Sequence, residues 1–312
     1  MSDAIRTCPF FGICGGCKYD FASPEYHTQK VGELRGIPTT DAPVWVAPGG
    51  RRRAEFSFEN GKIGFLARGS KNVVAIDSCP NLSRAINDFI PHLGKLPLMG
   101  AGTILVTECA NGIDVGVISG VPFYSAEFRA AAIAMPAVRV TWNGGVVAQR
   151  AVPKIEFSGH TVDYPPHGFL QPGKSGEDAI RQRVVAAAFG ARRVADLFCG
   201  LGNFTFALNA DGFDISCQFK TRDLFKQPLT QGMLAQYDCV VLDPPRAGAD
   251  AQCREIARSN VPRVIYVSCN PTTFARDMET LTRGGYKMQS LTPVDQFVGS
   301  AHWELVAVFS KD

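Results

Sequence analysis

The sequence Val264-Ile-Tyr-Val-Ser-Cys-Asn-Pro271 is an apolar run that stops at a polar, proline-containing loop. An earlier run, Val240-Val-Leu-Asp-Pro-Pro-Arg246, stops in the same way. Short apolar runs with such endings are typical of buried strands in an α/β sheet. They would place the Cys269 thiol and the Asp243 carboxylate at the carboxyl ends of two strands, where open α/β sheets bind ligands. This pairing favours a covalent enzyme over a binding module.

Strands and helices alternate around these two runs, from about residue 166 to the end of the chain. Such alternation is typical of a parallel, doubly wound sheet, here with a hairpin-like pair of strands at its end. The predicted helices span 176–189, 250–259 and 272–283, and the predicted strands span 193–198, 239–242, 264–267, 287–294 and 303–309.

The part of the chain before residue 166 is predicted to be rich in β-hairpins. The turns Glu59-Asn-Gly61, Asn111-Gly112 and Asn143-Gly-Gly145 each lie between alternating apolar stretches, which is the strongest short signal of a hairpin. Helices are expected at 24–34, 83–93 and 122–134. We therefore predict two domains, a β-hairpin-rich domain over 1–165 and a catalytic α/β domain over 166–312.

Composition is that of an ordinary globular protein. Of the 312 residues, 46% are apolar and 20% are charged, and the formal net charge is only +3. This balance permits an RNA partner but requires any basic surface to be local. No apolar run approaches the ~20 residues of a membrane helix. The first residues contain no apolar signal core, so a cytoplasmic protein without a membrane partner is expected.

The ten cysteines are distributed unevenly. Cys8, Cys14 and Cys17 fall within ten residues, whereas Cys79 stands alone before a proline. A long chain without a secretion signal argues against a disulfide scaffold. Four thiols could instead bind zinc or an iron–sulfur cluster, and their chemistry alone leaves both open. Most of the other cysteines are expected to be core residues.

A strand runs into a glycine turn at Val194-Ala-Asp-Leu-Phe-Cys-Gly-Leu-Gly-Asn-Phe204. Glycines allow positive φ and a close backbone approach, so a nucleoside cofactor could lie over this turn. The third glycine of a dinucleotide fingerprint is missing. Asp196 favours a nucleoside over a pyrophosphate, because a carboxylate repels phosphate. An ordinary tight turn explains this motif about as well when it is taken alone.

Five motifs follow one another along the chain: Gly168-Phe-Leu-Gln171, Asp196-Leu-Phe-Cys-Gly-Leu-Gly-Asn-Phe204, Asp243-Pro-Pro-Arg246, Ser268-Cys-Asn-Pro271 and His302-Trp-Glu304. Their combination and order resemble the S-adenosylmethionine-dependent uridine-C5 RNA methyltransferases. The resemblance covers nearly the whole chain, and it is the combination that is specific. It implies a Rossmann-like class I methyltransferase domain preceded by a β-rich, RNA-binding domain that carries a four-cysteine cluster.

The resemblance also implies a reaction. Cys269 is identified as the nucleophile that adds to C6 of a uracil, and Glu304 as the base that later removes the C5 proton. Addition of the thiolate makes C5 electron-rich, so that one difficult step becomes two easier ones. Taken alone, Cys269 would be an inert core cysteine and Glu304 a solvated acid at a strand edge. The implied cofactor contacts are Gln171, Phe198, Asn203, Asp223 and Asp243.

For the cysteines, the resemblance implies the 4Fe–4S site of the family's ribosomal-RNA members, with zinc as the alternative. The implied ligands are Cys8, Cys14, Cys17 and Cys79. This points to rRNA rather than tRNA as the substrate. Methyl transfer needs no redox step, so the cluster is expected to be a structural clamp. The basic loop Pro48-Gly-Gly-Arg-Arg-Arg53 is expected to contact RNA phosphates, with a solvated turn as the alternative.

Two departures from the family bear on function. Only seven residues precede Cys8, so the amino-terminal RNA-binding barrel is expected to be missing. After the glycine turn, Phe213-Asp-Ile215 is followed almost at once by Phe219–Asp223. No crossover helix fits between them, because a parallel crossover takes at least about 10–12 residues. The methyltransferase domain is therefore expected to be shortened, by a lost strand–helix unit or an omitted segment. Asp214 is a weak candidate for the carboxylate that holds the cofactor ribose.

Two other functions stay open from the sequence. A shortened cofactor fold would also suit an RNA-binding iron–sulfur protein that has lost catalysis, and such a protein would not bind S-adenosylmethionine. An amino-group methyltransferase would stay active without the Cys269 thiol.

Overall fold

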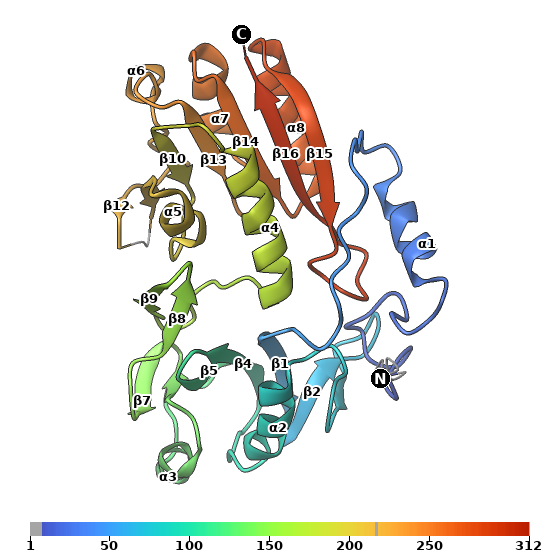
Figure 1. The fold of residues 1–312 in the computed structure, drawn as a ribbon. Coiled ribbons are helices and arrows are strands. Elements are labelled where there is room, and N and C mark those ends of the chain that lie inside the picture. Colours follow the sequence, from blue (N-terminus) through green and yellow to red (C-terminus); the bar gives the residue numbers. More distant parts are fainter. Residues whose placement is uncertain (1–7, 216–217, 312) are drawn as a thin grey trace.

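The computed structural model describes residues 8–215 and 218–311, which form two seven-stranded sheets and one separate hairpin (Figure 1). The first sheet has the strand order β3-β2-β1-β4-β5-β6-β7. Its strands are β1 (Arg53–Glu59), β2 (Lys62–Leu66), β3 (Val73–Ala75), β4 (Ala101–Cys109), β5 (Gly112–Ser119), β6 (Arg139–Trp142) and β7 (Gly145–Gln149). The separate hairpin joins β8 (Lys154–Phe157) to β9 (His160–Asp163).

The three predicted hairpins are confirmed as β1–β2, β4–β5 and β6–β7. In the first turn, Asn60 and Gly61 have φ of 49° and 80°, as a type I′ turn requires. Alternate residues of β1, Phe56 and Phe58, are buried in a core shared with α2 and α3. One face of this sheet therefore packs against the two helices.

The two helices on this sheet begin at serine caps. α2 (Arg84–Leu93) follows Ser83, whose side chain accepts a hydrogen bond from the Ile86 N–H, close to the predicted start. α3 (Ala126–Ala134) begins four residues later than predicted. The side chain of Ser125 accepts from the Phe128 N–H, and this capping bond fixes the start of the helix.

The second sheet has the order β12-β11-β10-β13-β14-β16-β15. Its neighbours pair parallel, except that β16 is antiparallel to β14 and β15. The predicted doubly wound sheet with a terminal hairpin is thus confirmed. Its strands are β10 (Val194–Leu197), β11 (Asp211–Asp214), β12 (Lys220–Thr221), β13 (Cys239–Leu242), β14 (Arg263–Ser268), β15 (Lys287–Val294) and β16 (Glu304–Ser310). The helices are α4 (Lys174–Ala187), α5 (Asn203–Leu208), α6 (Gln231–Leu234), α7 (Asp250–Arg258) and α8 (Pro271–Arg283).

The central strands are buried on both faces. Val241 and Ile265 share a core cluster with Val184 of α4, whereas Val240 lies in a cluster with Ile256 of α7 and Phe274 of α8. Helices on both faces explain why β13 and β14 are continuous apolar runs instead of alternating ones.

The crossover between β11 and β12 contains no helix among its described residues, as predicted. The two strands nevertheless pair parallel, with Phe213 opposite Lys220 and Asp214 opposite Thr221. β12 begins beside the last residues of β11, so the chain does not have to return along the sheet. The lower limit on crossover length therefore does not apply to so short a strand.

Phe219 lies over the glycines next to this crossover. A Cβ added to Gly202 would come within 2.6 Å of the Phe219 ring, and one added to Gly212 within 3.1 Å. The ring centroid is also 5.3 Å from that of Phe206 on α5. Gly202 is therefore needed for side-chain packing, whereas sequence reasoning connected it with a ligand.

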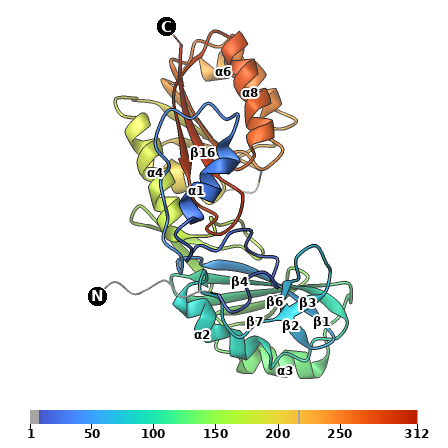
Figure 2. The ribbon, with the colours of Figure 1, turned by 90° about the vertical axis from the view of Figure 1, so that its right-hand side faces the viewer.

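The amino-terminal segment lies along the second sheet although it precedes the first sheet in sequence (Figure 2). α1 (Tyr26–Val31) and the 3-10 helix η1 (Gly32–Leu34) are followed by a stretch in which Val44 bridges Val294 of β15. Leu34 belongs to the core of the second sheet. The division at residue 165 stays a prediction, and part of the predicted first domain packs on the catalytic sheet. None of the helices in the described ranges is long and apolar enough to cross a membrane.

Candidate functional site

Cys269 and Glu304 come together at the end of two neighbouring strands. β14 and β16 are antiparallel, and their last pair is Ser268 with Leu305. The next residues in this register are Cys269 and Glu304, so the sheet sets the thiol beside the carboxylate. Glu304 is only 2% exposed, whereas Cys269 is partly exposed. The sheet therefore brings together the two residues that the motifs paired.

Asp243 follows β13, which is the other neighbour of β14 in the sheet, and lies near this pair. β13 runs parallel to β14 with Leu242 opposite Tyr266, so Asp243 and Cys269 leave the sheet at the same edge. The Asp243 N–H donates to the Leu197 carbonyl of β10 at 3.2 Å. Asp243 thus stands between the glycine-turn strand and the cysteine strand, at the predicted ligand-binding edge.

Three carboxyl groups lie close together at this edge, and removal from water raises the pKa of each. Burial raises the pKa of Asp243 to about 7, with the Asp196 carboxylate adding to it and a hydrogen bond from Gln171 opposing it. Burial likewise raises the pKa of Asp196 to about 7, against a 2.6 Å hydrogen bond from Thr205. The pKa of Glu304 is well above its ordinary value, because of burial first and the Asp243 carboxylate second.

The pKa of the Cys269 thiol is raised to about 11. Burial is the main cause, and the carboxylates of Glu304 and Asp243 add to it, while Arg246 opposes them. Nucleophilic cysteines need the thiolate, which nearby positive charge favours. Burial and the two carboxylates therefore favour the thiol over the thiolate at this position.

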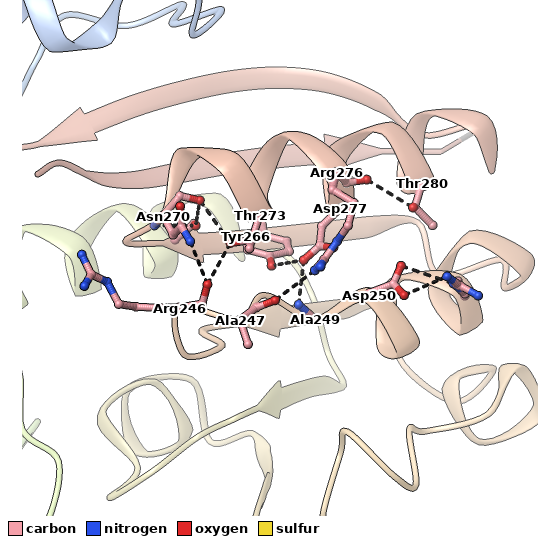
Figure 3. A network of polar contacts seen from close by, with 12 residues as sticks. Arg246, Ala247, Ala249, Asp250, Tyr266, Asn270, Thr273, Arg276, Asp277 and Thr280 are labelled. Atoms are coloured by element: carbon pink, nitrogen blue, oxygen red, sulfur yellow. Dashed lines mark hydrogen bonds and ion pairs between the residues drawn. The ribbon is translucent and has the colours of Figure 1, made fainter.

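Hydrogen bonds fasten the loop of residues 243–249 to the helix that follows Cys269 (Figure 3). The carboxylate of Asp277 on α8 is fully buried and accepts from the Ala249 N–H and the Tyr266 hydroxyl, both at 2.6 Å. Two carbonyl groups of the loop accept further hydrogen bonds from side chains. The Ala247 carbonyl accepts from Arg276 (3.1 Å), and the Arg246 carbonyl accepts from Asn270 (2.9 Å) and Thr273 (3.2 Å). The loop and α8 therefore form one unit, which keeps Asp243 beside Cys269.

The glycine turn after β10 gathers two predicted cofactor contacts. Gly200 has φ +50°, and a Cβ there would meet nothing within 4 Å, so this side of the turn is open. The Gly200 N–H donates to the Asp214 carboxylate at 3.2 Å. Asn203 begins α5, and the Phe198 ring centroid lies 5.4 Å from that of Phe225. Phe198 and Asn203 thus flank the turn at the same sheet edge as Asp243.

The remaining predicted contacts occupy different places. Gln171 is buried, accepts from Gln296 at 3.0 Å, and lies at the carboxyl group of Asp243. Asp223 follows the edge strand β12, and its carboxylate accepts from the backbone N–H groups two and three residues later, at 3.1 and 3.3 Å. Gln171 therefore belongs to the central group, whereas Asp223 stabilises its own turn at the edge of the sheet.

The four predicted metal ligands gather in one region, but the described residues do not show a metal-binding arrangement. Burial raises the pKa of Cys17 to about 12, with Cys79, Cys14 and Cys8 adding to it in that order, so the remote Cys79 does lie near the trio. Across residues 8–215 and 218–311, however, no three His, Cys, Asp or Glu side chains are arranged to hold a metal ion. The predicted four-cysteine metal centre, whether 4Fe–4S or zinc, is therefore not supported by the geometry.

The triple-arginine loop is not the uniformly exposed basic surface that was expected. Arg52 is 8% exposed and pairs with the buried Glu177 of α4 at 2.6 Å. Arg51 donates to the Arg53 carbonyl at 3.0 Å. The Arg53 guanidinium lies 5.7 Å from the centroid of the exposed Phe169 ring. Arg52 thus joins the first sheet to α4, and the expectation of an RNA contact is wrong for this residue.

Sequence reasoning missed two features close to the site. Lys30 and Asp295 form an ion pair in which both side chains are 0% exposed, although they are 265 residues apart. No local motif indicates such a pair. Asp196 was singled out for its charge alone. One of its oxygens is buried without a hydrogen-bond partner in the part of the chain that the structure describes.

Known proteins resemble this chain in sequence and fold. A family model of tRNA (uracil-5-)-methyltransferases matches residues 218–312. An uncharacterized RNA methyltransferase of Agrobacterium fabrum is 37% identical, covering 96% of this chain and 83% of the relative. A 23S rRNA (uracil-C5)-methyltransferase of Edwardsiella ictaluri is 30% identical, covering 97% and 81%. The solved tRNA (uracil-54, C5)-methyltransferase of Pyrococcus abyssi has the same fold, with a TM-score of 0.73 at 19% identity, covering 91% and 82%.

The sequence alignments also reveal a difference in length. The alignment with the A. fabrum protein extends over 345 positions, whereas this chain has 312 residues. The relative therefore has at least 33 residues without a counterpart here, which is the difference between the two numbers. The alignment with this relative nevertheless covers almost the whole chain, and the solved P. abyssi structure has the same fold. The chain belongs to the S-adenosylmethionine-dependent uracil-C5 RNA methyltransferase family and is an RNA (uracil-5-)-methyltransferase.

Proposed function

We propose that this enzyme methylates C5 of a uridine in 23S rRNA through a covalent bond between Cys269 and C6, with Glu304 as the base. The observation that carries the proposal is the register of β14 and β16, which ends at Ser268 opposite Leu305, so that Cys269 and the buried Glu304 come next. The Glu304 carboxylate lies close enough to raise the pKa of the thiol. A pyrimidine ring between them would have C6 near the sulfur and C5 near the carboxylate. Nucleophile and base would then act on neighbouring atoms.

The chemistry follows from these two groups. The Cys269 thiol loses its proton to solvent, the sulfur bonds to C6, and the electron pair of the C5=C6 bond makes C5 nucleophilic. C5 then bonds to the electrophilic methyl group of S-adenosylmethionine while the methyl–sulfonium bond breaks, and S-adenosylhomocysteine is released. Glu304 then takes the C5 proton, the C5=C6 double bond forms again, and the sulfur leaves C6. The cysteine is regenerated, so no oxidant or reductant is needed.

The carboxyl groups at the sheet edge fit a cationic methyl donor. Asp196 has a buried oxygen without a hydrogen-bond partner among the described residues. Burial raises the pKa of both Asp196 and Asp243, and the Asp196 carboxylate raises that of Asp243 further. A sulfonium or ammonium group nearby would relieve both conditions, because an opposite charge favours the ionised form. We assign Asp243, Gln171, Asn203 and Phe198 as donor-binding residues. Asp223 is assigned a place near the adenine by family resemblance alone.

The described residues between β11 and β12 contain no helix, and this observation favours a second candidate, an RNA-binding protein without catalysis. The A. fabrum relative has residues that this chain lacks, and we place part of that difference after β11. Phe219 packs over Gly202 and Gly212 near that point. The open space beside Gly200 and the cluster of carboxyl groups that includes Asp243 are both present in this chain. For this reason we favour the active enzyme.

The substrate is tested with a panel of RNAs. The protein, labelled S-adenosylmethionine, and transcripts of 23S rRNA, 16S rRNA and tRNA are incubated separately. We expect label only in 23S rRNA, and nucleoside mass spectrometry should identify the product as 5-methyluridine. Label in tRNA would mean that the enzyme acts on tRNA and not on 23S rRNA. A product methylated on nitrogen would contradict methylation at C5. Calorimetry with S-adenosylmethionine separates the non-catalytic candidate, which would show no binding.

We also propose that Cys8, Cys14, Cys17 and Cys79 hold a 4Fe–4S cluster, because the other three thiols lie close enough to Cys17 to raise its pKa. Anaerobically purified protein is expected to contain about four irons per chain. Cys17→Ser should lose this iron, whereas Cys109→Ala, which removes a buried cysteine elsewhere, should keep it. Zinc in place of iron would support the alternative metal, and protein free of both metals would refute the proposal.

A further inference from the structure

The loop of residues 295–303 connects β15 to β16 and is held by a lysine from α1. The ammonium group of Lys30 pairs with the carboxylate of Asp295, and both side chains are 0% exposed. The same group donates to the Phe297 carbonyl at 2.8 Å and lies 4.9 Å from the centroid of the Trp303 ring. One buried cation therefore contacts the first, the third and the last residue of the loop.

A tyrosine from the same helix forms a second bridge. The hydroxyl of Tyr26 donates to Asp295 at 2.7 Å and accepts from the Gly299 N–H at 2.9 Å. The Gly299 carbonyl in turn accepts from the N–H groups of residues 18 and 19, at 2.7 and 2.9 Å. The indole of Trp303 donates to the carbonyl of the lysine at 3.1 Å. The loop is thus bonded to the amino-terminal segment at both ends and in its middle.

A buried ion pair is a poor way to gain stability alone. Removing two charges from water costs much of what their attraction returns, so an apolar pair of similar volume is often at least as stable. Such a pair does fix one arrangement, because any other leaves an unpaired buried charge. Lys30 and Asp295 therefore specify the position of the loop, and the residue that directly follows the loop is Glu304.

We propose that Lys30, Tyr26 and Asp295 are positioning residues for the catalytic base. They hold the loop before β16 so that the Glu304 carboxylate stays beside Cys269. This inference rests on the proposed roles of those two residues. A displacement of about 1 Å at a reacting group costs up to roughly 100-fold in rate. Loosening the loop should therefore slow the step in which the C5 proton is removed.

The step affected makes the inference testable. The bond between Cys269 and C6 forms before the proton is removed, so slow proton removal leaves more enzyme bound covalently to RNA. Tyr26→Phe is the mildest variant, since it removes one hydroxyl and keeps the ring. With a 23S rRNA transcript and S-adenosylmethionine, we expect it to turn over about tenfold more slowly and to hold about tenfold more adduct than wild type. Lys30→Met should act in the same direction and more strongly.

A fluorinated transcript separates this step from the earlier ones. With 5-fluorouridine at the target, no C5 proton exists to be removed, so every competent enzyme stops as the adduct. Wild type and Tyr26→Phe should then give equal amounts of adduct. The ratio of adduct on ordinary RNA to adduct on fluorinated RNA therefore reports proton removal alone.

Matched controls distinguish positioning from loss of stability. Tyr237→Phe also removes a hydroxyl bonded to a carboxylate, that of Asp211 at 2.9 Å, but not in this loop. Arg139→Met removes the cation of another buried ion pair, with Asp114 in the first sheet. Both should keep the wild-type adduct ratio. A wild-type ratio in Tyr26→Phe would overturn the inference. Absence of a fluorinated adduct in wild type would instead overturn the proposed mechanism.

Discussion

Replacing Cys269 by alanine is expected to lower the rate of RNA methylation by about 10⁴-fold or more, because no other group can make C5 of the uracil nucleophilic. Cys269 directly follows β14, is partly exposed and belongs to none of the core clusters, so the fold should be unaffected. Binding of S-adenosylmethionine should also be unchanged, since the proposed donor contacts come from other residues. Methyl transfer to a 23S rRNA transcript measures the first effect, and calorimetry measures the second.

Two comparisons sharpen this test. Cys269→Ser keeps the shape but has a hydroxyl, which ionises far less readily than a thiol, and it should be almost as inactive. Cys239→Ala removes a fully buried cysteine from β13 and should retain methylation. Neither Cys269→Ala nor Cys269→Ser should form an adduct with RNA that contains 5-fluorouridine. Methylation that survives in Cys269→Ala would favour an amino-group methyltransferase.

Local sequence patterns predicted the elements that carry the site. The apolar runs before Asp243 and Cys269 are β13 and β14, which are parallel neighbours, so the two residues reach one edge as expected. The Asn-Gly turns predicted their hairpins because the φ values they need are properties of the residues themselves. The pairing of Cys269 with Glu304 came from family resemblance alone. Its cause is the antiparallel register of β16 with β14, which no local pattern contains.

What could not be predicted depends on partners that are distant in sequence. Arg52 was expected to face RNA, but the burial of Glu177 opposite it makes it a structural ion pair. Lys30 was passed over because a single lysine in a short helix is normally solvated. A parallel β12 after so short a connection was also missed, since crossover lengths assume a strand that returns along the sheet.

Replacing Glu304 by glutamine is expected to stop turnover while increasing the amount of enzyme bound covalently to RNA. Glutamine keeps the shape of the side chain but cannot take the C5 proton, and loss of such a base costs about 10²- to 10⁴-fold. The earlier steps remain, so the methylated adduct should persist on denaturing gels with ordinary uridine RNA. An inactive variant without adduct would mean that Glu304 is needed before the base acts.

The electrostatics of the site give this variant a signature that damage to the fold would not produce. Burial raises the pKa of Glu304, so the folded state binds a proton more tightly than the unfolded state and loses stability as the pH rises. The neutral amide avoids this loss, and the variant should unfold at the same or a higher temperature than wild type at neutral pH. The Glu304 carboxylate also raises the pKa of Cys269, so its removal should lower that pKa and speed alkylation of the thiol by iodoacetamide. An enzyme that is catalytically inactive, undiminished in stability and more reactive at its cysteine has lost a base. If alkylation slows and the unfolding temperature falls, Glu304 is instead a structural residue.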